Sequence, residues 1–209
     1  MFGRAENNEE KPDLRRMLEC WKLCVVGNED VYLRHYIDGY SQLNAFLAEL
    51  GFLFGFVVSD INGKLKRLDN MVEEGTVARM MNSEMSRGKE RAGDSGTVAL
   101  VRLHRAMDFV LQMLHAVCTH PDDTKMGPVA RPIYDNSLGL HLPWLVNTSV
   151  RAALVTLKKR RQLIEQFRGN LTNEQTIELL EQAVCQGRVV YDIVQRLCVS
   201  NRLLNISQY

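Results

Sequence analysis

Apolar side chains recur at helical spacing over most of the chain. The first such stretch follows Pro12, where a proline and an aspartate are typical helix start signals. A second helix is predicted to begin near Asn28–Asp30 and to continue to Leu50. The apolar positions of the first stretch are Leu14, Met17, Leu18, Trp21 and Cys24.

The run from Leu50 to Val58 is almost wholly apolar and contains Gly51 and Gly55. We interpret it as a continuous or bent helix that enters the core and becomes polar after Val58. A buried strand is the alternative, because short apolar runs fit both structures. The run is far too short to span a bilayer as a helix.

The rest of the chain predicts further helices. Residues 71–92 form a Met-rich, charged helical stretch, and residues 97–117 form the most strongly amphipathic helix. Residues 119–132 contain three prolines, which predicts a long loop. Helices are then expected from Pro143 to Lys159 and from about Glu174 to Leu203. Since no repeat or convincing strand pattern is present, the prediction is an all-α protein of several helices.

Length and composition narrow the class of protein. The chain has 209 residues, and we expect residues 1–10 to be a flexible tail and residues 11–209 a single domain. The formal net charge is +1, so no nucleic-acid partner is expected. The start of the chain lacks the apolar segment of a secretory signal, and none of the five cysteines forms a CxxC pair. These features favour a cytoplasmic protein with reduced, mostly buried thiols.

Two charged pairs are candidates for binding chemistry. Asp60 and Lys64 are four residues apart, so on a helix they share a face. A surface ion pair is the simplest interpretation, but the preceding apolar run favours a place at the opening of an apolar pocket. Arg102 and Arg105 lie three residues apart on the amphipathic helix. They either meet an anionic group or extend their stems toward water.

Other candidates have plainer alternatives. His141 precedes a predicted helix start and is typical of a cap or surface residue, while Trp144 is typical of a core residue. The basic run Lys158–Arg161 is interpreted as a solvated helix end, with contact to an anionic membrane as the alternative. We find no phosphate-binding glycine loop, HExxH, zinc-spaced Cys/His set or GxSxG elbow. The sequence therefore predicts no cofactor, no metal site and no enzymatic activity.

Four segments together resemble the glycolipid transfer protein family, and within it the ceramide-1-phosphate transfer branch. They are LGFLFGFVVSDINGKL, SGTVALVRLHRAM, YDNSLGLHLPWLV and VVYDIVQRLCVSNRLLNIS, in the family's order and with plausible spacing. The resemblance extends from about residue 11 to the end of the chain. It implies a two-layer, all-helical sandwich whose interior opens to take up the chains of a ceramide.

The resemblance also implies roles for individual residues. Asp60 matches the family's aspartate that bonds the ceramide amide and hydroxyl. Lys64 and Arg102 stand where phosphate-binding members carry Lys and Arg, and where sugar-binding members carry Asn and Trp. Arg105 and His141 complete the predicted headgroup set. The residues expected to line the pocket for the lipid chains are Phe52, Phe56, Val98, Leu142 and Trp144.

Two positions depart from the phosphate-binding pattern. Val98 replaces a further arginine one helical turn before Arg102, and Leu142 replaces the histidine before Pro143 and Trp144, so that His141 falls one residue earlier. The leading hypothesis is non-enzymatic binding and transfer of a sphingolipid with a phosphate headgroup by a monomer that associates reversibly with membranes. The alternatives are a sphingolipid-sensing interaction module and a helical scaffold that binds no lipid.

Overall fold

A computed structural model describes residues 12–206, and the expected tail at residues 1–10 lies outside them. Three short 3₁₀ helices are also present: η1 (Phe52–Phe54), η2 (Val72–Glu74) and η3 (Leu138–His141). Two strands, β1 (Val25–Val26) and β2 (Asp30–Val31), pair antiparallel. The α-helices of the described residues are α1 (Leu14–Cys24), α2 (Leu33–Glu49), α3 (Gly55–Asp69), α4 (Val77–Ser86), α5 (Gly96–Thr119), α6 (Met126–Asp135), α7 (Trp144–Val155), α8 (Arg160–Phe167) and α9 (Asn173–Ser200).

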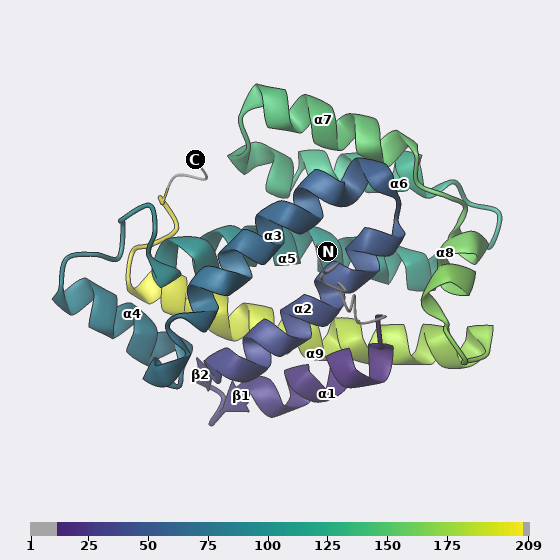
Figure 1. The fold of residues 1–209 in the computed structure, drawn as a ribbon. Coiled ribbons are helices and arrows are strands. Elements are labelled where there is room, and N and C mark those ends of the chain that lie inside the picture. Colours follow the sequence, from purple (N-terminus) through teal and green to yellow (C-terminus); the bar gives the residue numbers. More distant parts are fainter. Residues whose placement is uncertain (1–11, 207–209) are drawn as a thin grey trace, which may run out of the picture.

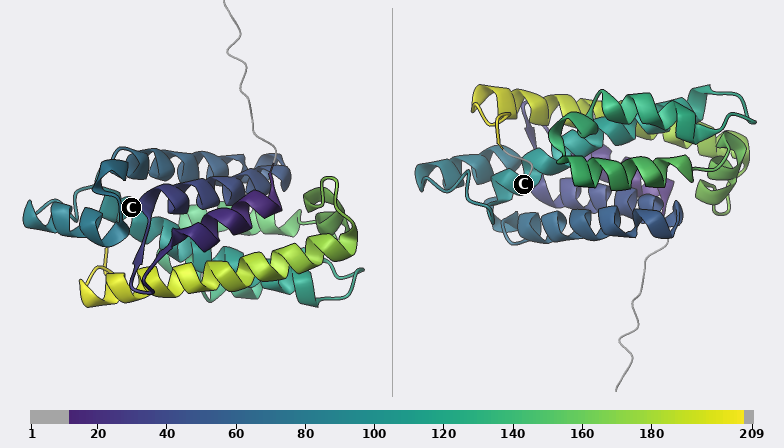
Figure 2. Two further views of the ribbon diagram at one scale, coloured as in Figure 1. Left: turned by 90° about the horizontal axis from the view of Figure 1, so that it is seen from below. Right: turned by 90° about the horizontal axis from the view of Figure 1, so that it is seen from above.

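The helices form two layers, which confirms the predicted all-α sandwich (Figures 1 and 2). Helices α1, α2 and α3 lie side by side in one layer, and α5, α6 and α9 lie side by side in the other. Helix α7 covers one edge, where it contacts both α6 and η1, and α8 lies at one end of the sandwich. The core between the layers is apolar, with Trp21, Tyr40 and Met107 fully buried.

The beginning of α2 differs from the prediction. The chain first forms the β1–β2 hairpin, so α2 starts at Leu33 rather than near residue 28. Three residues, 27–29, link the paired Val26 and Asp30, and the N–H of Glu29 donates to the Val26 carbonyl at 3.2 Å. The central residues of this turn, Gly27 and Asn28, both have positive φ, at 55° and 65°, as a type I′ turn requires. The absence of a convincing strand pattern in the sequence reflects the length of these strands, which is only two residues each.

The apolar run that follows α2 is bent, as the first interpretation proposed. Gly51 has φ 116°, a conformation that side-chain-bearing residues rarely adopt, and it separates α2 from η1 and α3. The expectation that the run enters the core is wrong for most of its length, because Phe52 is 94% exposed and Leu53 and Phe56 are each 43% exposed. Phe54, in the same run, is buried.

The predicted amphipathic helix is confirmed as α5, and its first turn is held by side chains. The carboxylate of Glu84 accepts hydrogen bonds from the backbone N–H groups of Gly96 and Thr97, each at 2.8 Å. The Ser95 hydroxyl accepts from the N–H of Val98 at 3.0 Å. A carboxylate at a helix N-terminus satisfies donors that the helix itself leaves unpaired and complements its dipole. These bonds fix the position of α5, which carries Arg102.

The loop predicted at residues 119–132 is partly wrong, because α6 begins at Met126. Pro128 lies in its first turn, where a missing N–H removes no intrahelical bond. Pro132 lies within the helix, and a pair of ion pairs from Asp135 to Arg131 and Arg151 supports the end of α6.

The helix predicted from Pro143 to Lys159 is in fact two helices. Helix α7 ends at Val155, and Lys159 caps the start of α8. Arg160 is buried: its Nε donates to the Val117 carbonyl at 2.7 Å, and its guanidinium also pairs with Asp122. The prediction of a solvated helix end is therefore wrong for Arg160, which joins the start of α8 to the end of α5, whereas Lys158 and Arg161 of the basic run are exposed.

The remaining helical predictions agree in outline with the structure. The stretch at residues 71–92 contains η2 and α4, and the last helix is α9, which ends at Ser200 rather than Leu203. Thr172 and Gln175 form a capping box at the start of α9. All five cysteines are unpaired thiols, of which Cys24, Cys118 and Cys198 are buried.

A buried histidine between α5 and α9 makes folding sensitive to pH. The His104 ring stacks on Tyr191 at 4.1 Å between centroids, and its Nε2 lies 2.6 Å from Gln195 Oε1. Among the described residues, its Nδ1 has no hydrogen-bond partner. Burial, partly offset by the bond to Gln195, lowers the pKa of His104 to about 4, against an ordinary value of 6.5. Protonation of His104 in the folded protein thus places a positive charge in the core, which is unfavourable.

We predict that acidification destabilises the protein through His104. Between pH 6.5 and pH 4 the unfolded chain binds a proton that the folded chain does not, so the free energy of unfolding falls as the pH decreases through this window. The full loss from this group is about 3 kcal/mol. Urea denaturation of the parent and of His104→Gln at pH 7 and pH 4.5 measures it. The parent should lose more stability than the variant, and an equal loss in both would contradict the assignment.

Candidate functional site

Three charged side chains from α3 and α5 meet at a cavity of about 170 Å³, which we call the charged cavity. Asp60 and Lys64 lie one turn apart on α3, and Arg102 lies on α5. The remaining lining side chains are apolar and come from α3, α5, η3, the following residue and α7. They are Phe56, Val57, Ile61, Leu103, Ala106, Leu138, Leu142, Val146 and Val150.

Lys64 is an unusually buried ammonium group. Its side chain is 7% exposed, whereas that of its ion-pair partner Asp60 is 48% exposed. Burial lowers the pKa of Lys64, the hydrogen bond and charge of Asp60 raise it, and the positive charges of Arg102 and Arg67 lower it further. The Asp60 carboxylate therefore offsets part of the cost of burying this ammonium group. An additional anion at this cavity would stabilise both Lys64 and Arg102.

Tyr40 joins α2 to α5 next to Leu103, which lines the charged cavity. Its ring is fully buried on α2, and its hydroxyl donates to the carbonyl of Leu103 on α5 at 2.9 Å. Burial, followed by the negative charge of Asp60, raises the pKa of Tyr40. Sequence reasoning had not singled out Tyr40, and its helical spacing with Tyr36 and Leu43 marks only a core position.

The structure brings Leu142, but not His141, to the charged cavity. Leu142 follows η3 and lines the cavity, whereas His141 is exposed at the end of η3. Partial burial, followed by the positive charge of Arg105, lowers the pKa of His141. The side chain next to Pro143 that enters the cavity is thus apolar.

Arg105 lies outside the lining of the charged cavity and holds the C-terminal segment. Its Nη2 donates to the Leu204 carbonyl at 2.7 Å. Arg91, in the loop before α5, bonds the same segment at the Arg202 carbonyl and the Asn205 side chain. In this structure the predicted headgroup residue Arg105 therefore joins α5 to residues 202–206.

A second cavity lies beyond the charged one and is lined only by apolar side chains. This apolar cavity has a volume of about 40 Å³. Its walls come from α2, η1, α5, α7, α8 and the segment between α7 and α8. The lining residues are Leu43, Phe46, Leu47, Leu50, Phe54, Phe109, Val110, Met113, Leu114, Val117, Leu154, Leu157, Leu163 and Phe167.

The residues expected to line a pocket for lipid chains occupy different places. Phe56 and Leu142 line the charged cavity. Val98 is buried in the first turn of α5, outside the lining of both cavities. Phe52 and Trp144 do not line either cavity and are 94% and 77% exposed. The two aromatic rings instead extend from the protein surface on η1 and at the start of α7.

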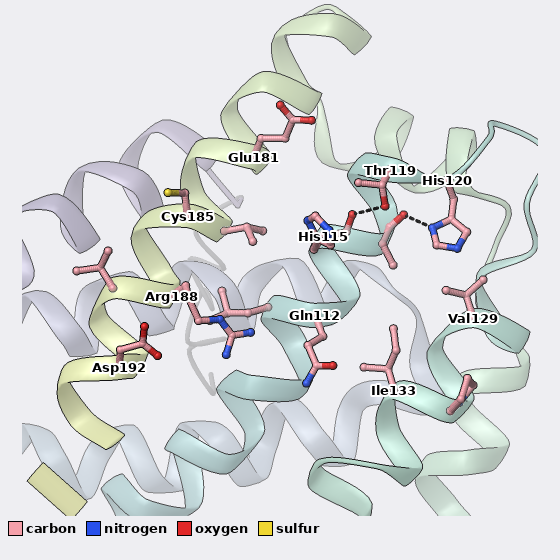
Figure 3. A pocket seen from close by; sticks show the side chains of 15 residues that line it. Gln112, His115, Thr119, His120, Val129, Ile133, Glu181, Cys185, Arg188 and Asp192 are labelled. Atoms are coloured by element: carbon pink, nitrogen blue, oxygen red, sulfur yellow. Dashed lines mark hydrogen bonds between the residues drawn. The ribbon is translucent and has the colours of Figure 1, made fainter. Parts of the chain in front are cut away.

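A larger hollow of about 1170 Å³, the outer groove, lies between α5, α6 and α9 (Figure 3). His115 and Gln112 of α5 lie between Cys185 and Arg188 of α9 on one side and Ile133 of α6 on the other. None of the residues predicted for the headgroup or the lipid chains lines it. The outer groove is also lined by polar side chains, among them His115, Glu181 and Arg188. The charged cavity is the better candidate because it brings together Asp60, Lys64 and Arg102, three of the residues predicted for the headgroup.

The comparison with known proteins agrees with this geometry. The model of the family "Glycolipid transfer protein (GLTP)" matches residues 31–169, more than half of the chain. The chain therefore belongs to the glycolipid transfer protein family, as the resemblance predicted.

Its relatives include ceramide-1-phosphate transfer proteins. The chain is 28% identical to the Bos taurus protein over 210 residues, which cover 95% of this chain and 98% of the relative. It is 29% identical to the Danio rerio protein over 207 residues, with 92% and 97% coverage.

Solved structures show the same fold. The ligand-free mouse ceramide-1-phosphate transfer protein is similar, with a TM-score of 0.87 at 28% identity, covering 93% of this chain and 98% of that one. The human protein in complex with 12:0 ceramide-1-phosphate has a TM-score of 0.84 at 28% identity, with 93% and 99% coverage.

We predict that Asp60 stabilises the folded protein by neutralising Lys64. Asp60→Asn should lower the free energy of unfolding at pH 7 by about 1–2 kcal/mol, less than for a fully buried pair because Asp60 is half-exposed. Asp60→Asn combined with Lys64→Met should recover most of this loss, since no ammonium is left unpaired. Asp69→Asn is a matched control, because Asp69 pairs with Arg34 at an exposed site. Chemical denaturation measures all four proteins, and failure of the double variant to recover stability would contradict the prediction.

Proposed function

We propose that this protein binds one sphingolipid with a phosphate headgroup, of the ceramide-1-phosphate type, and transfers it between membranes without covalent chemistry. The observation that carries the proposal is the charged cavity: a nearly buried Lys64 next to Arg102, at the edge of an otherwise apolar hollow. The relatives described above are named for transfer of ceramide-1-phosphate, and the human one has been solved with that lipid bound.

The charges of the cavity favour a phosphate monoester. Lys64 and Arg102 carry two positive charges against the single negative charge of Asp60. A phosphate monoester has a charge of about −1.5 to −2 at pH 7, and it offers several acceptor oxygens to an ammonium and a forked guanidinium. A neutral sugar would bring no negative charge to Lys64 and Arg102. The site therefore favours phosphate over sugar headgroups.

Asp60 has a second role in this proposal. Its carboxylate is half-exposed and can accept hydrogen bonds from the amide and hydroxyl of a ceramide while phosphate takes over the pairing of Lys64. Lys64 would then bind the phosphate headgroup, and Asp60, one helix turn away, would bind the amide and hydroxyl of the ceramide. These contacts replace the ion pair between Lys64 and Asp60, so neither charge is left without a partner.

The apolar cavity is the place for the lipid chains. Its lining has no polar side chain, and each buried methylene contributes about 0.8 kcal/mol, so two chains supply a large driving force. The cavity must widen to receive them, because 40 Å³ is far less than a lipid chain occupies. Entry of the chains therefore requires the helices around it to separate.

Exposed apolar side chains around the charged cavity form the surface proposed to meet a membrane. Trp144 and Leu145 begin α7, Leu140 lies on η3, and Phe52 and Leu53 lie on η1. Amphipathic and aromatic groups of this kind suit the boundary between lipid headgroups and acyl chains. Among the described helices, none is both long and apolar enough to cross a bilayer. Association through this surface is therefore proposed to be peripheral and reversible.

We predict that Arg102→Leu removes the preference for a phosphate headgroup. Loss of a charge-assisted contact costs about 1.5–3 kcal/mol, which is a roughly 10- to 150-fold weaker affinity for ceramide-1-phosphate. Affinity for ceramide should change little. Arg34→Leu is the control, since Arg34 pairs with Asp69 away from the cavity. Transfer of both labelled lipids between vesicles measures the effect, and equal losses for both lipids would show that Arg102 is only structural.

We further predict that Leu142→His strengthens binding of ceramide-1-phosphate. The substitution places a hydrogen-bond donor in the lining of the charged cavity, and a neutral hydrogen bond contributes about 0.5–1.5 kcal/mol, or roughly 2- to 12-fold in affinity. His141→Ala should change affinity little, because His141 lies outside the lining. A large loss in His141→Ala would instead show that this loop shifts on binding.

Weak binding without transfer by the parent protein would favour the lipid-sensing alternative.

A further inference from the structure

Helices α5 and α7 each contribute side chains to the lining of both the charged cavity and the apolar cavity. On α5 the lining begins with Arg102 and Ala106, continues with Val110 and Met113, and ends at Val117. On α7 it includes Val146 and Val150 of the charged cavity and Leu154 of the apolar cavity, at spacings of four residues. The two cavities are therefore consecutive parts of one path along these helices.

Helix α8 closes the far end of this path. Of the two cavities, Leu163 and Phe167 line the apolar one, and both side chains are buried. Phe167 also lines a separate hollow of about 560 Å³, together with residues 12–15 and 168–171. The Phe167 ring meets the Phe46 ring of α2 edge to face, with centroids 5.2 Å apart. In Figure 1, α8 lies across the end of the sandwich where α5 and α7 both finish. A chain that follows the path meets this aromatic pair.

The wall formed by α8 is anchored at both of its ends. At its beginning, the buried Arg160 donates to the Val117 and Cys118 carbonyls at 2.7 and 3.2 Å and pairs with Asp122. In its last turn, Gln166 donates to the carbonyl of Glu49, the last residue of α2. These bonds hold α8 to both layers. The end of the path is thus fixed to α5 and α2, whereas Leu138 of η3 and Val146 in the first turn of α7 line its beginning at the charged cavity.

We propose that Phe167, packed against Phe46, is the stop that sets the longest lipid chain the protein accepts. The inference rests on the proposed function and adds a specificity-determining residue to it. Up to the stop, each additional methylene enters the apolar path and strengthens binding about fourfold. Beyond the stop, an additional methylene must displace close-packed aromatic rings or remain in water. Affinity therefore stops rising at a defined chain length.

The test compares Phe167→Ala with a matched variant, Phe109→Ala. Phe109 lines the same apolar cavity from α5, one turn from Ala106 of the charged cavity, so the control removes the same side chain near the opposite end of the path. Partition of ceramide-1-phosphate with 12-, 16-, 18- and 24-carbon acyl chains between phosphatidylcholine vesicles and each protein gives the relative affinities. Dividing each value by that of the parent protein cancels the contribution of the vesicle.

In Phe167→Ala we expect the ratio of affinity for the 24-carbon lipid to that for the 16-carbon lipid to rise at least tenfold over the parent. In Phe109→Ala all four lipids should weaken by a similar factor. Phe167→Leu should give a smaller shift in the same direction, and it provides the comparison if the alanine variant does not fold. Identical chain-length profiles in the parent, Phe167→Ala and Phe167→Leu would overturn the stop. If the parent bound none of the four lipids, the proposed function itself would fail.

Discussion

The pairing of a nearly buried ammonium group with a half-exposed carboxylate is the constraint on which the rest of this structure depends. Lys64 remains charged among apolar side chains because Asp60 lies one turn away on α3. Glu84 at the start of α5 and the Tyr40 hydroxyl at Leu103 hold the opposite helix, so Arg102 stands beside the pair. The protein therefore has an ammonium, a guanidinium and a carboxylate at one otherwise apolar cavity, an arrangement that suits an amphiphile with an anionic headgroup.

Sequence patterns predicted most of the helices because amphipathic spacing is a local property. They failed where distant partners decide the structure. The three prolines of residues 119–132 indicated a loop, yet a proline in the first turn of α6 costs no hydrogen bond. The basic run before α8 resembled a solvated end, but Arg160 is buried against carbonyls more than forty residues earlier in the chain. Such long-range bonds leave no periodic signal in the sequence.

The sequence likewise predicted part of the candidate site. The four-residue spacing of Asp60 and Lys64, and the resemblance for Arg102, identified three groups that the fold places at one cavity. Phe52 and Trp144 were expected to line the pocket for the lipid chains, as the resemblance implied, yet both extend from the surface. Whether an aromatic ring lines a pocket or lies beside its opening depends on the turn that carries it. In η1 that turn follows Gly51, and at α7 it follows η3.

The small volume of the apolar cavity has a consequence for what the resting protein takes up from its surroundings. At about 40 Å³ it is well below the ~150 Å³ of an engineered cavity that admits benzene. An apolar solute therefore finds too little space in this cavity, and it can enter only if the close-packed helices around the cavity separate. A molecule without an anionic end gains nothing at Lys64 and Arg102 toward that separation. The closed interior thus acts as an energetic threshold, and only cargo with both a charged end and long chains crosses it.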